Sequence, residues 1–94
     1  MSDPSPAAPR ESAIRFPLDF PIKVMGLQAD GFAQAIVSVV QTHAPDFDAT
    51  TLEQRASREG RYVSLTVTVR ASSQAQLDAL YRALTSHPMV KFVL

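Results

Sequence analysis

Two glycines near the start of the chain have the spacing of a phosphate-binding loop. Gly26 and Gly31 are separated by four residues, as in the G-x-x-x-x-G pattern of nucleotide hydrolases. In those loops the second glycine is followed by Lys and then Ser or Thr, which contact the phosphates and the metal ion. Here Phe32 and Ala33 follow instead. The spacing therefore does not predict nucleotide hydrolysis.

The same segment is compatible with the binding of a small acidic effector. A strand, a glycine, a short loop and a helix start present backbone N–H groups that favour an anion or a carboxylate. The hypothesised effector loop consists of Gly26, Asp30, Gly31 and Phe32. The alternative is an ordinary tight connection in which Asp30 caps the helix and already occupies its positive end.

Four arginines lie around the second and third expected strands, and they are Arg55, Arg58, Arg61 and Arg70. Because Glu53 and Glu59 are interleaved with them, one interpretation is a solvated, partly ion-paired hairpin. The other is a partner surface for an anion or a nucleic acid. The outward positions of the third strand are Ser64, Thr66 and Thr68, which cannot stack bases. This absence of aromatics argues against nucleic acid.

No catalytic, cofactor-binding or metal-binding constellation is visible. The chain has no cysteine, and His43 and His87 are each expected in the last turn of a helix, where a cation is favoured. Neither histidine has a partner at the spacing of a metal site, and no serine lies in G-x-S-x-G. We predict no catalytic residue, no cofactor and no metal, and therefore a protein that is not an enzyme.

The composition describes one small domain behind a short tail. The chain has 94 residues with nine basic and nine acidic side chains, so no global field attracts nucleic acid or a membrane. Residues 1–13 are rich in proline and small residues and are expected to be a disordered tail, passive or used in docking. Residues 14–94 form the expected domain, whose small core would benefit from dimerisation. The lack of cysteine and of a signal-like segment is typical of a cytoplasmic protein.

The first half of the domain predicts a strand and a helix. Phe20, Ile22 and Val24 alternate as the buried face of a strand that ends at Gly26, with prolines that suit a strand entry or a sheet edge. The stripe of the following helix is Phe32, Ile36, Val39, Val40 and His43. Pro45 marks its end, and Phe47 is expected to fold back onto the core.

The second half predicts two strands, a helix and a final strand. Thr51–Ser57 is expected to be an edge strand, followed by the turn Arg58–Arg61 and by a clearly alternating strand over Val63–Arg70. A capping box of Ser73 and Gln76 begins the second helix, which ends at His87-Pro88. The inner stripe of that helix is Leu77, Leu80, Tyr81 and Leu84, and the alternating residues of the last strand are Val90, Phe92 and Leu94.

The predicted order is β-α-β-β-α-β, in the α+β class. Each strand has one apolar face, so both helices must cover the same face of one four-stranded antiparallel sheet. Right-handed crossovers give a ferredoxin-like sandwich in which the first and third strands are central. The second and fourth strands are then the sheet edges.

Several segments together resemble the YbeD-like family of small proteobacterial proteins of unknown function. They are FPLDFPIKVMG at 16–26, VVQTHAP at 39–45, SREGRYVSLTVTVRA at 57–71, and LYRAL and MVKFVL near the end. The resemblance covers about residues 16–94 and implies a ferredoxin-like fold similar to ACT regulatory domains. Some members are labelled putative lipoate regulatory proteins. ACT domains often have proline before the helix glycine, where this chain has Asp30.

The functional hypothesis is a small regulatory or protein-interaction domain without catalysis. It would associate through a strand edge or the polar sheet face with a protein partner or a second copy, and an ACT-like effector is a further option. The alternative is an anion- or nucleic-acid-binding module that uses the four arginines. No membrane partner is expected.

Overall fold

The computed structural model describes residues 15–94 and has the order β-α-β-β-α-β. The expected tail, residues 1–13, lies outside the described residues. The strands are β1 (Leu18–Leu27), β2 (Glu53–Ala56), β3 (Tyr62–Ala71) and β4 (Val90–Val93). The helices are α2 (Phe32–His43) and α3 (Gln74–Thr85), and the short 3-10 helix η1 (Ala49–Thr51) precedes β2.

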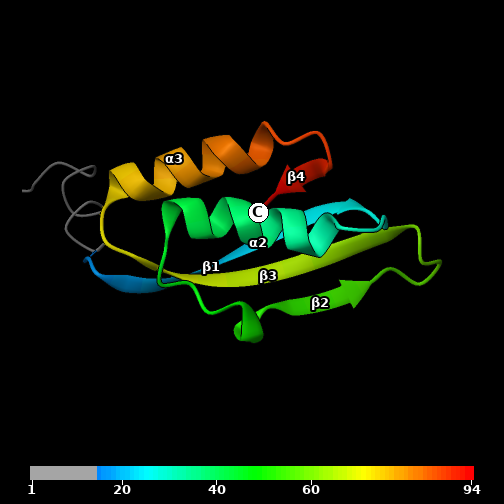
Figure 1. Cartoon of the computed structure of the whole chain (residues 1–94), viewed down its shortest axis with the longest axis horizontal. Helices are drawn as coiled ribbons and strands as arrows, with labels where there is room; N and C mark the ends of the chain where they lie inside the picture. Colours follow the sequence, from blue (N-terminus) through cyan, green and yellow to red (C-terminus); the bar gives the residue numbers. More distant parts are fainter. Residues whose placement is uncertain (1–14) are drawn as a thin grey trace, which may run out of the picture.

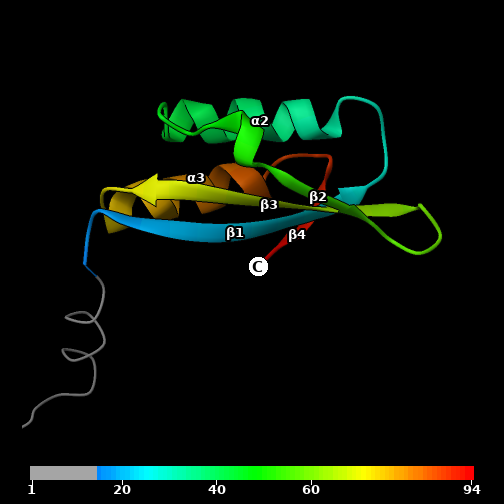
Figure 2. The same ribbon diagram turned by 90° about the horizontal axis from the view of Figure 1, so that it is seen from below.

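The four strands form one antiparallel sheet in the order β2-β3-β1-β4. Both helices lie on the same face of this sheet (Figures 1 and 2). The predicted ferredoxin-like sandwich is confirmed, with β1 and β3 in the centre and β2 and β4 at the edges. The opposite face, called the outer face below, carries no helix among residues 15–94.

The core lies between the sheet and the helices. Alternating residues of β1 and β3 meet the apolar stripes of α2 and α3, as the periodicities predict. Its members are Ile22, Val24, Phe32, Ile36, Val40, Ala44, Phe47, Val63, Leu65, Val67, Val69, Ala71, Leu77, Leu80 and Leu84. Phe47 packs into the core from its loop, as expected, whereas Phe20 is only half-buried.

Gly26 does not end the first strand, contrary to the prediction. It lies inside β1 beside an irregularity in the pairing with β4, and it is buried. A Cβ at this position would meet the carbonyl oxygen of Met89 and would lie 2.7 Å from Cζ of Phe32. Gly26 is therefore a packing glycine, which lets Phe32 and the chain before β4 approach the strand.

The start of α2 also differs from the prediction. The N-cap is Gly31, with φ of 83°, and no side chain accepts a hydrogen bond there. Asp30 lies one position too early, in the turn before the cap, so its carboxylate does not cap the helix. The left-handed backbone at the cap suits glycine because it lacks a Cβ.

The start of α3 confirms the predicted cap. Oγ of Ser73 accepts a hydrogen bond from the Gln76 N–H over 3.1 Å. Oε1 of Gln76 accepts from the Ser72 N–H over 2.6 Å, and Nε2 donates to the His43 carbonyl over 2.8 Å. Gln76 thereby joins the start of α3 to the end of α2, but its side chain bonds the N–H of Ser72 and not that of the N-cap Ser73, so the predicted capping box is only half formed.

Three boundaries in the second half are corrected. β2 covers only Glu53–Ala56, because the preceding residues form η1, whose cap is Asp48. His87 lies after the end of α3 rather than in its last turn, and its Nδ1 accepts a hydrogen bond from the Met89 N–H over 3.1 Å. The third boundary is that of β4, which ends at Val93 rather than Leu94.

The expected alternation of Val90, Phe92 and Leu94 is only partly confirmed, because Phe92 and Leu94 share the outer face whereas Val90 packs against the core. Gly26 pairs with Val90 and Met25 pairs with Phe92, so β4 has one extra residue at Lys91. Such a bulge shifts the alternation by one position. Val93 therefore packs against the core, and the side chain of Phe92 is displaced to the outer face.

Candidate functional site

The outer face is the candidate site because no helix of residues 15–94 covers it and because its rows of side chains differ sharply in character. One row crosses the sheet from Glu53 on β2 through Thr66 on β3 to Lys23 on β1. The next row runs from Arg55 through Ser64 to Met25, where the polar side of the face gives way to an apolar side.

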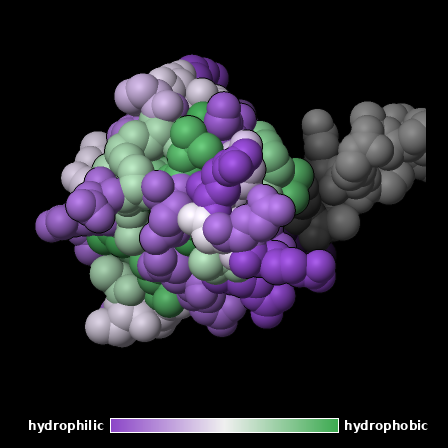
Figure 3. All heavy atoms as spheres, turned by 90° about the vertical axis from the view of Figure 1, so that its right-hand side faces the viewer, coloured by the Kyte–Doolittle hydropathy of each residue, from purple (hydrophilic) through white to green (hydrophobic). Residues whose placement is uncertain are grey.

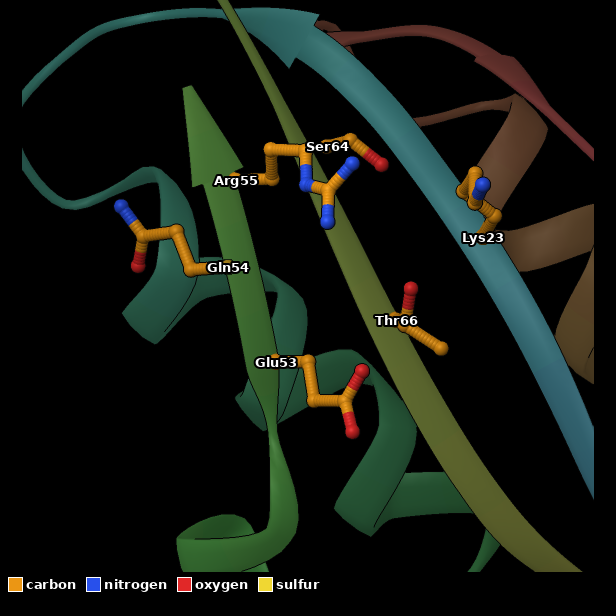
Figure 4. A pocket seen from close by; sticks show the side chains of 6 residues that line it. All are labelled: Lys23, Glu53, Gln54, Arg55, Ser64 and Thr66. Carbon is orange, nitrogen blue, oxygen red and sulfur yellow. The ribbon is translucent and has the colours of Figure 1, made fainter.

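The polar side contains a shallow hollow of about 260 Å³. Glu53 and Arg55 extend over it from β2, Ser64 and Thr66 form its floor on β3, and Lys23 closes it on β1, while Gln54 points away (Figure 4). Within residues 15–94, none of the five inward side chains makes an ion pair or a side-chain hydrogen bond with another side chain. The hollow thus presents two cations, one carboxylate and two hydroxyls to the solvent.

The apolar side is a contiguous patch, which we call the apolar strip and which consists of Met25, Leu27, Tyr62, Phe92 and Leu94. Met25 pairs with Phe92, and Leu27 pairs with Tyr62. Leu94 lies beside Lys23 and exchanges two backbone hydrogen bonds with it, of 2.8 and 3.1 Å. Phe92 is 49% exposed, Leu27 45% and Tyr62 40%. Most of the strip lies toward one end of the sheet, where hydrophobic and hydrophilic side chains both reach the surface (Figure 3).

Two further hollows border the apolar strip. One, of about 140 Å³, lies on the β2 side and is lined by Met25, Tyr62 and Arg55 among others. The other, of about 330 Å³, lies on the β4 side and is lined by residues that include Leu27 and Lys91. The strip is therefore bounded on both sides by a depression that has a cation at its rim.

The hypothesised effector loop is only partly brought together. Asp30, Gly31 and Phe32 line a hollow of about 310 Å³ at the start of α2, together with Gln28, Gln34, Gln54 and other residues. Gly26 is not among the lining residues, because it is buried under Phe32 inside β1. Asp30 and Gly31 are exposed, whereas Phe32 belongs to the core.

The four arginines do not form one cluster. Arg70 and Tyr62 lie at opposite ends of β3, about 26 Å apart at roughly 3.3 Å per residue. Arg70 forms an exposed ion pair with Asp19, in which Nη1 and Oδ1 are 3.3 Å apart. Arg58 and Arg61 lie in the turn between β2 and β3, next to the apolar strip, and Arg55 lies on β2.

The titratable groups whose pKa is displaced lie away from the outer face. The hydroxyl and the backbone N–H of Thr50 donate to Asp48, and these hydrogen bonds lower the pKa of Asp48. Burial raises the pKa of Tyr81 on α3. Among residues 15–94, no three His, Asp or Glu side chains converge in a way that could hold a metal ion. Neither described α-helix has the length and apolar character needed to span a membrane.

The fold and the uncovered sheet face define the class as a small ferredoxin-like domain of the ACT-like type. The ACT domain of the GTP pyrophosphokinase of Chlorobium tepidum has this fold, with a TM-score of 0.56 and 18% identity over 82% of this chain and 97% of that one. The solution structure of protein HP0495 from H. pylori is also similar, with a TM-score of 0.71 and 12% identity over 99% of this chain and 98% of that one.

The chain belongs to the DUF493 family of proteins of unknown function, whose model matches residues 11–94. A UPF0250 protein of Nitrosomonas europaea is 58% identical over 89% of this chain and 97% of its own. One from Janthinobacterium is 62% identical over 92% and 94%, and one from Ralstonia nicotianae is 57% identical over 99% and 96%. The resemblance to the YbeD-like family is confirmed.

The apolar strip was missed by the sequence interpretation, although part of it was visible. Met25 alternates out of phase with Ile22 and Val24, and Tyr62 directly precedes the first core residue of β3, so both had to face outward. The absence of outward aromatics was argued from Ser64, Thr66 and Thr68 alone. The structure adds Tyr62 and Phe92 to that face.

Proposed function

We propose that this protein is a small regulatory or interaction domain that acts by binding another protein through its outer face, without catalysing a reaction. The observation that carries the proposal is the apolar strip. Single exposed apolar residues are ordinary, but a contiguous patch rimmed by polar residues is typical of a protein–protein interface. A cytoplasmic location is part of the proposal and rests on the cysteine-free sequence.

The strip has the anatomy of a binding surface. Tyr62 and Phe92 flank its central residues Met25 and Leu27 on either side, and aromatic residues supply much of the energy of interfaces. Its rim is charged and is exposed to solvent when the protein is alone. The edge strand β4 carries Phe92, so a partner strand that extends the sheet at this edge would lie directly beside the strip. A second copy of the chain is one such partner.

Affinity capture from the extract of the native organism tests this proposal. Tagged wild-type protein is compared with Phe92→Ser and with Arg82→Ser, a matched surface change on α3. We expect Phe92→Ser to lose at least about nine-tenths of the captured partner, as for an aromatic residue that anchors an interface, and Arg82→Ser to retain it. Equal capture by all three proteins would contradict the use of the strip.

Sedimentation velocity of the purified proteins separates the two kinds of partner. If the partner is a second copy, wild-type protein sediments as a dimer at micromolar concentration and Phe92→Ser as a monomer. If both proteins are monomers, the partner in the extract is a different protein.

A second candidate function is the binding of a small effector at the start of α2. The observation in its favour is the hollow of about 310 Å³, which is lined by three glutamine amides and lies beside a helix end with no side-chain cap. Titration with amino acids and with lipoyl-type acids, followed by backbone amide shifts, tests it. Saturable shifts at Gly31 and Phe32 support effector binding, and their absence for every ligand contradicts it. The link to lipoate metabolism remains a prediction.

A further inference from the structure

We infer that the partner of the apolar strip is an acidic protein segment that carries large apolar side chains. This inference rests on the proposed function and specifies the chemistry of the partner. It follows from the charges that surround the strip, which are unbalanced although the whole chain has a formal net charge of zero.

The hollows on and beside the outer face are bordered by more positive than negative groups. The residues lining the hollows of about 260, 140 and 330 Å³ include three cations, Lys23, Arg55 and Lys91, and one carboxylate, Glu53. Within residues 15–94 none of these four side chains takes part in an ion pair. Arg58 and Arg61 in the adjoining turn add two positive charges, and Glu59 adds one negative charge.

The cations lie on both sides of the strip. Arg55 lies on the β2 side, where it shares a hollow with Tyr62 and Met25. Lys91 lies on the β4 side, at the bulge, where it shares a hollow with Leu27. An extended or helical segment that places apolar side chains on the strip would therefore bring its flanking residues against cations. Acidic flanks would be attracted, and basic flanks would be repelled.

The apolar strip favours a protein segment over a nucleic acid. Three of its five members, Met25, Leu27 and Leu94, are aliphatic, and only Tyr62 and Phe92 could stack a base. The two aromatics are on β3 and β4 with β1 between them, so they do not form a continuous stacking platform. A partner that offers aliphatic groups to the strip and carboxylates to the surrounding cations is therefore a protein segment, since nucleic acids carry no aliphatic side chains.

The test is a titration of the full-length, isotope-labelled protein with two synthetic peptides. In both, Leu and Phe alternate with charged residues, which are Asp and Glu in one peptide and Lys and Arg in the other. We expect the acidic peptide alone to give saturable amide shifts at Leu27, Tyr62 and Phe92. Added salt should weaken its binding, since exposed charges are screened.

Variants distinguish the apolar contribution from the charge contribution. Phe92→Ser should weaken the acidic peptide at least about tenfold by removing the anchor. The double variant Arg55→Glu and Lys91→Glu should weaken it by about tenfold and should let the basic peptide bind. Arg82→Glu on α3, a matched charge reversal away from the strip, should change neither affinity. Amide spectra of each variant establish that it is folded.

Four results would overturn the inference. Equal binding of both peptides would overturn the acidic partner while leaving association through the strip intact. No shift at the strip with either peptide would overturn the inference, and the capture experiment would decide the proposed function separately. Tighter binding of an oligouridylate at the strip would assign it to nucleic acid. Dimerisation of the wild-type protein that Phe92→Ser abolishes would assign it to a second copy.

Discussion

Gly26 is the residue at which β1 leaves least room for a side chain. Gly26→Ala would force a methyl group against the Met89 carbonyl oxygen and the ring of Phe32, and overpacking of this kind costs about 1–3 kcal/mol. Urea unfolding measures the loss. Gly31→Ala is the control: apart from its chain neighbours, no atom of residues 15–94 lies within 4 Å of its Cβ, so it bears only the cost of its φ of 83°, about 1–2 kcal/mol. An unchanged stability for Gly26→Ala would contradict the close approach of Phe32.

Asp48 makes stability depend on pH in the acid range. Its pKa is lowered in the folded protein by the hydrogen bonds from Thr50, so folding favours the charged carboxylate. This contribution is present above the unfolded pKa of about 3.9 and is lost as the pH falls through the lower folded value. We expect Asp48→Asn to be less stable than the wild type near neutral pH, and the difference to shrink in acid.

Urea unfolding at a series of pH values checks this prediction for Asp48. Asp46→Asn is the matched control, because within residues 15–94 the Asp46 side chain accepts no hydrogen bond from another residue. A difference between wild type and Asp48→Asn that does not vary with pH would contradict the role of the carboxylate charge.

Gln76 connects the two helices. Gln76→Ala removes its hydrogen bonds to the Ser72 N–H and the His43 carbonyl, which should cost about 1–3 kcal/mol in the free energy of unfolding. Gln74→Ala removes only an exposed contact with Asp78 and should cost less than about 0.5 kcal/mol. Equal effects of the two substitutions in thermal unfolding would show that the helix-to-helix link adds no stability.

The central strand β3 has one buried and one outer side. Val67→Asp places an unpaired charge in the core and should cost about 3 kcal/mol or more, a large part of the stability of a small domain. The next residue, Thr68, lies on the outer face, so Thr68→Asp should leave the protein folded. Circular dichroism during thermal unfolding compares them, and a stable, cooperatively folding Val67→Asp variant would contradict this orientation of β3.

The elements that could be predicted are those in which apolar residues recur at a regular spacing without interruption. β3 alternates without interruption, and the stripes of α2 and α3 recur at helical spacing, so their faces follow from the sequence alone. β4 could not be predicted in this way, because the bulge at Lys91, opposite Met25 and Gly26, interrupts its alternation. That one extra residue decides whether Phe92 lies in the core or on the surface, and with it whether the candidate site is visible.

At the scale of the whole molecule, both helices of residues 15–94 lie on one face of the sheet. A domain of this size has a small core and is marginally stable. An exposed sheet face with a contiguous apolar patch is typical of a binding surface, because such patches are rare on monomeric proteins. The sequence led to the hypothesis of an interaction domain through the chemistry that it lacks, and the proposal of a binding surface rests on the apolar strip, which only the structure reveals. The four arginines were expected to gather on one surface because they are near one another in the sequence. They do not, since Arg70 and Arg61 lie at opposite ends of β3.

Site-specific photo-crosslinking in the native organism tests whether this protein associates with another protein through its outer face. A photoreactive phenylalanine analogue replaces Phe92 on the apolar strip, or Arg82 on α3 as the control. We expect position 92 to form a crosslink to a discrete protein and position 82 to form none. Crosslinks from position 82 with none from position 92 would contradict the claim that this protein associates through its outer face.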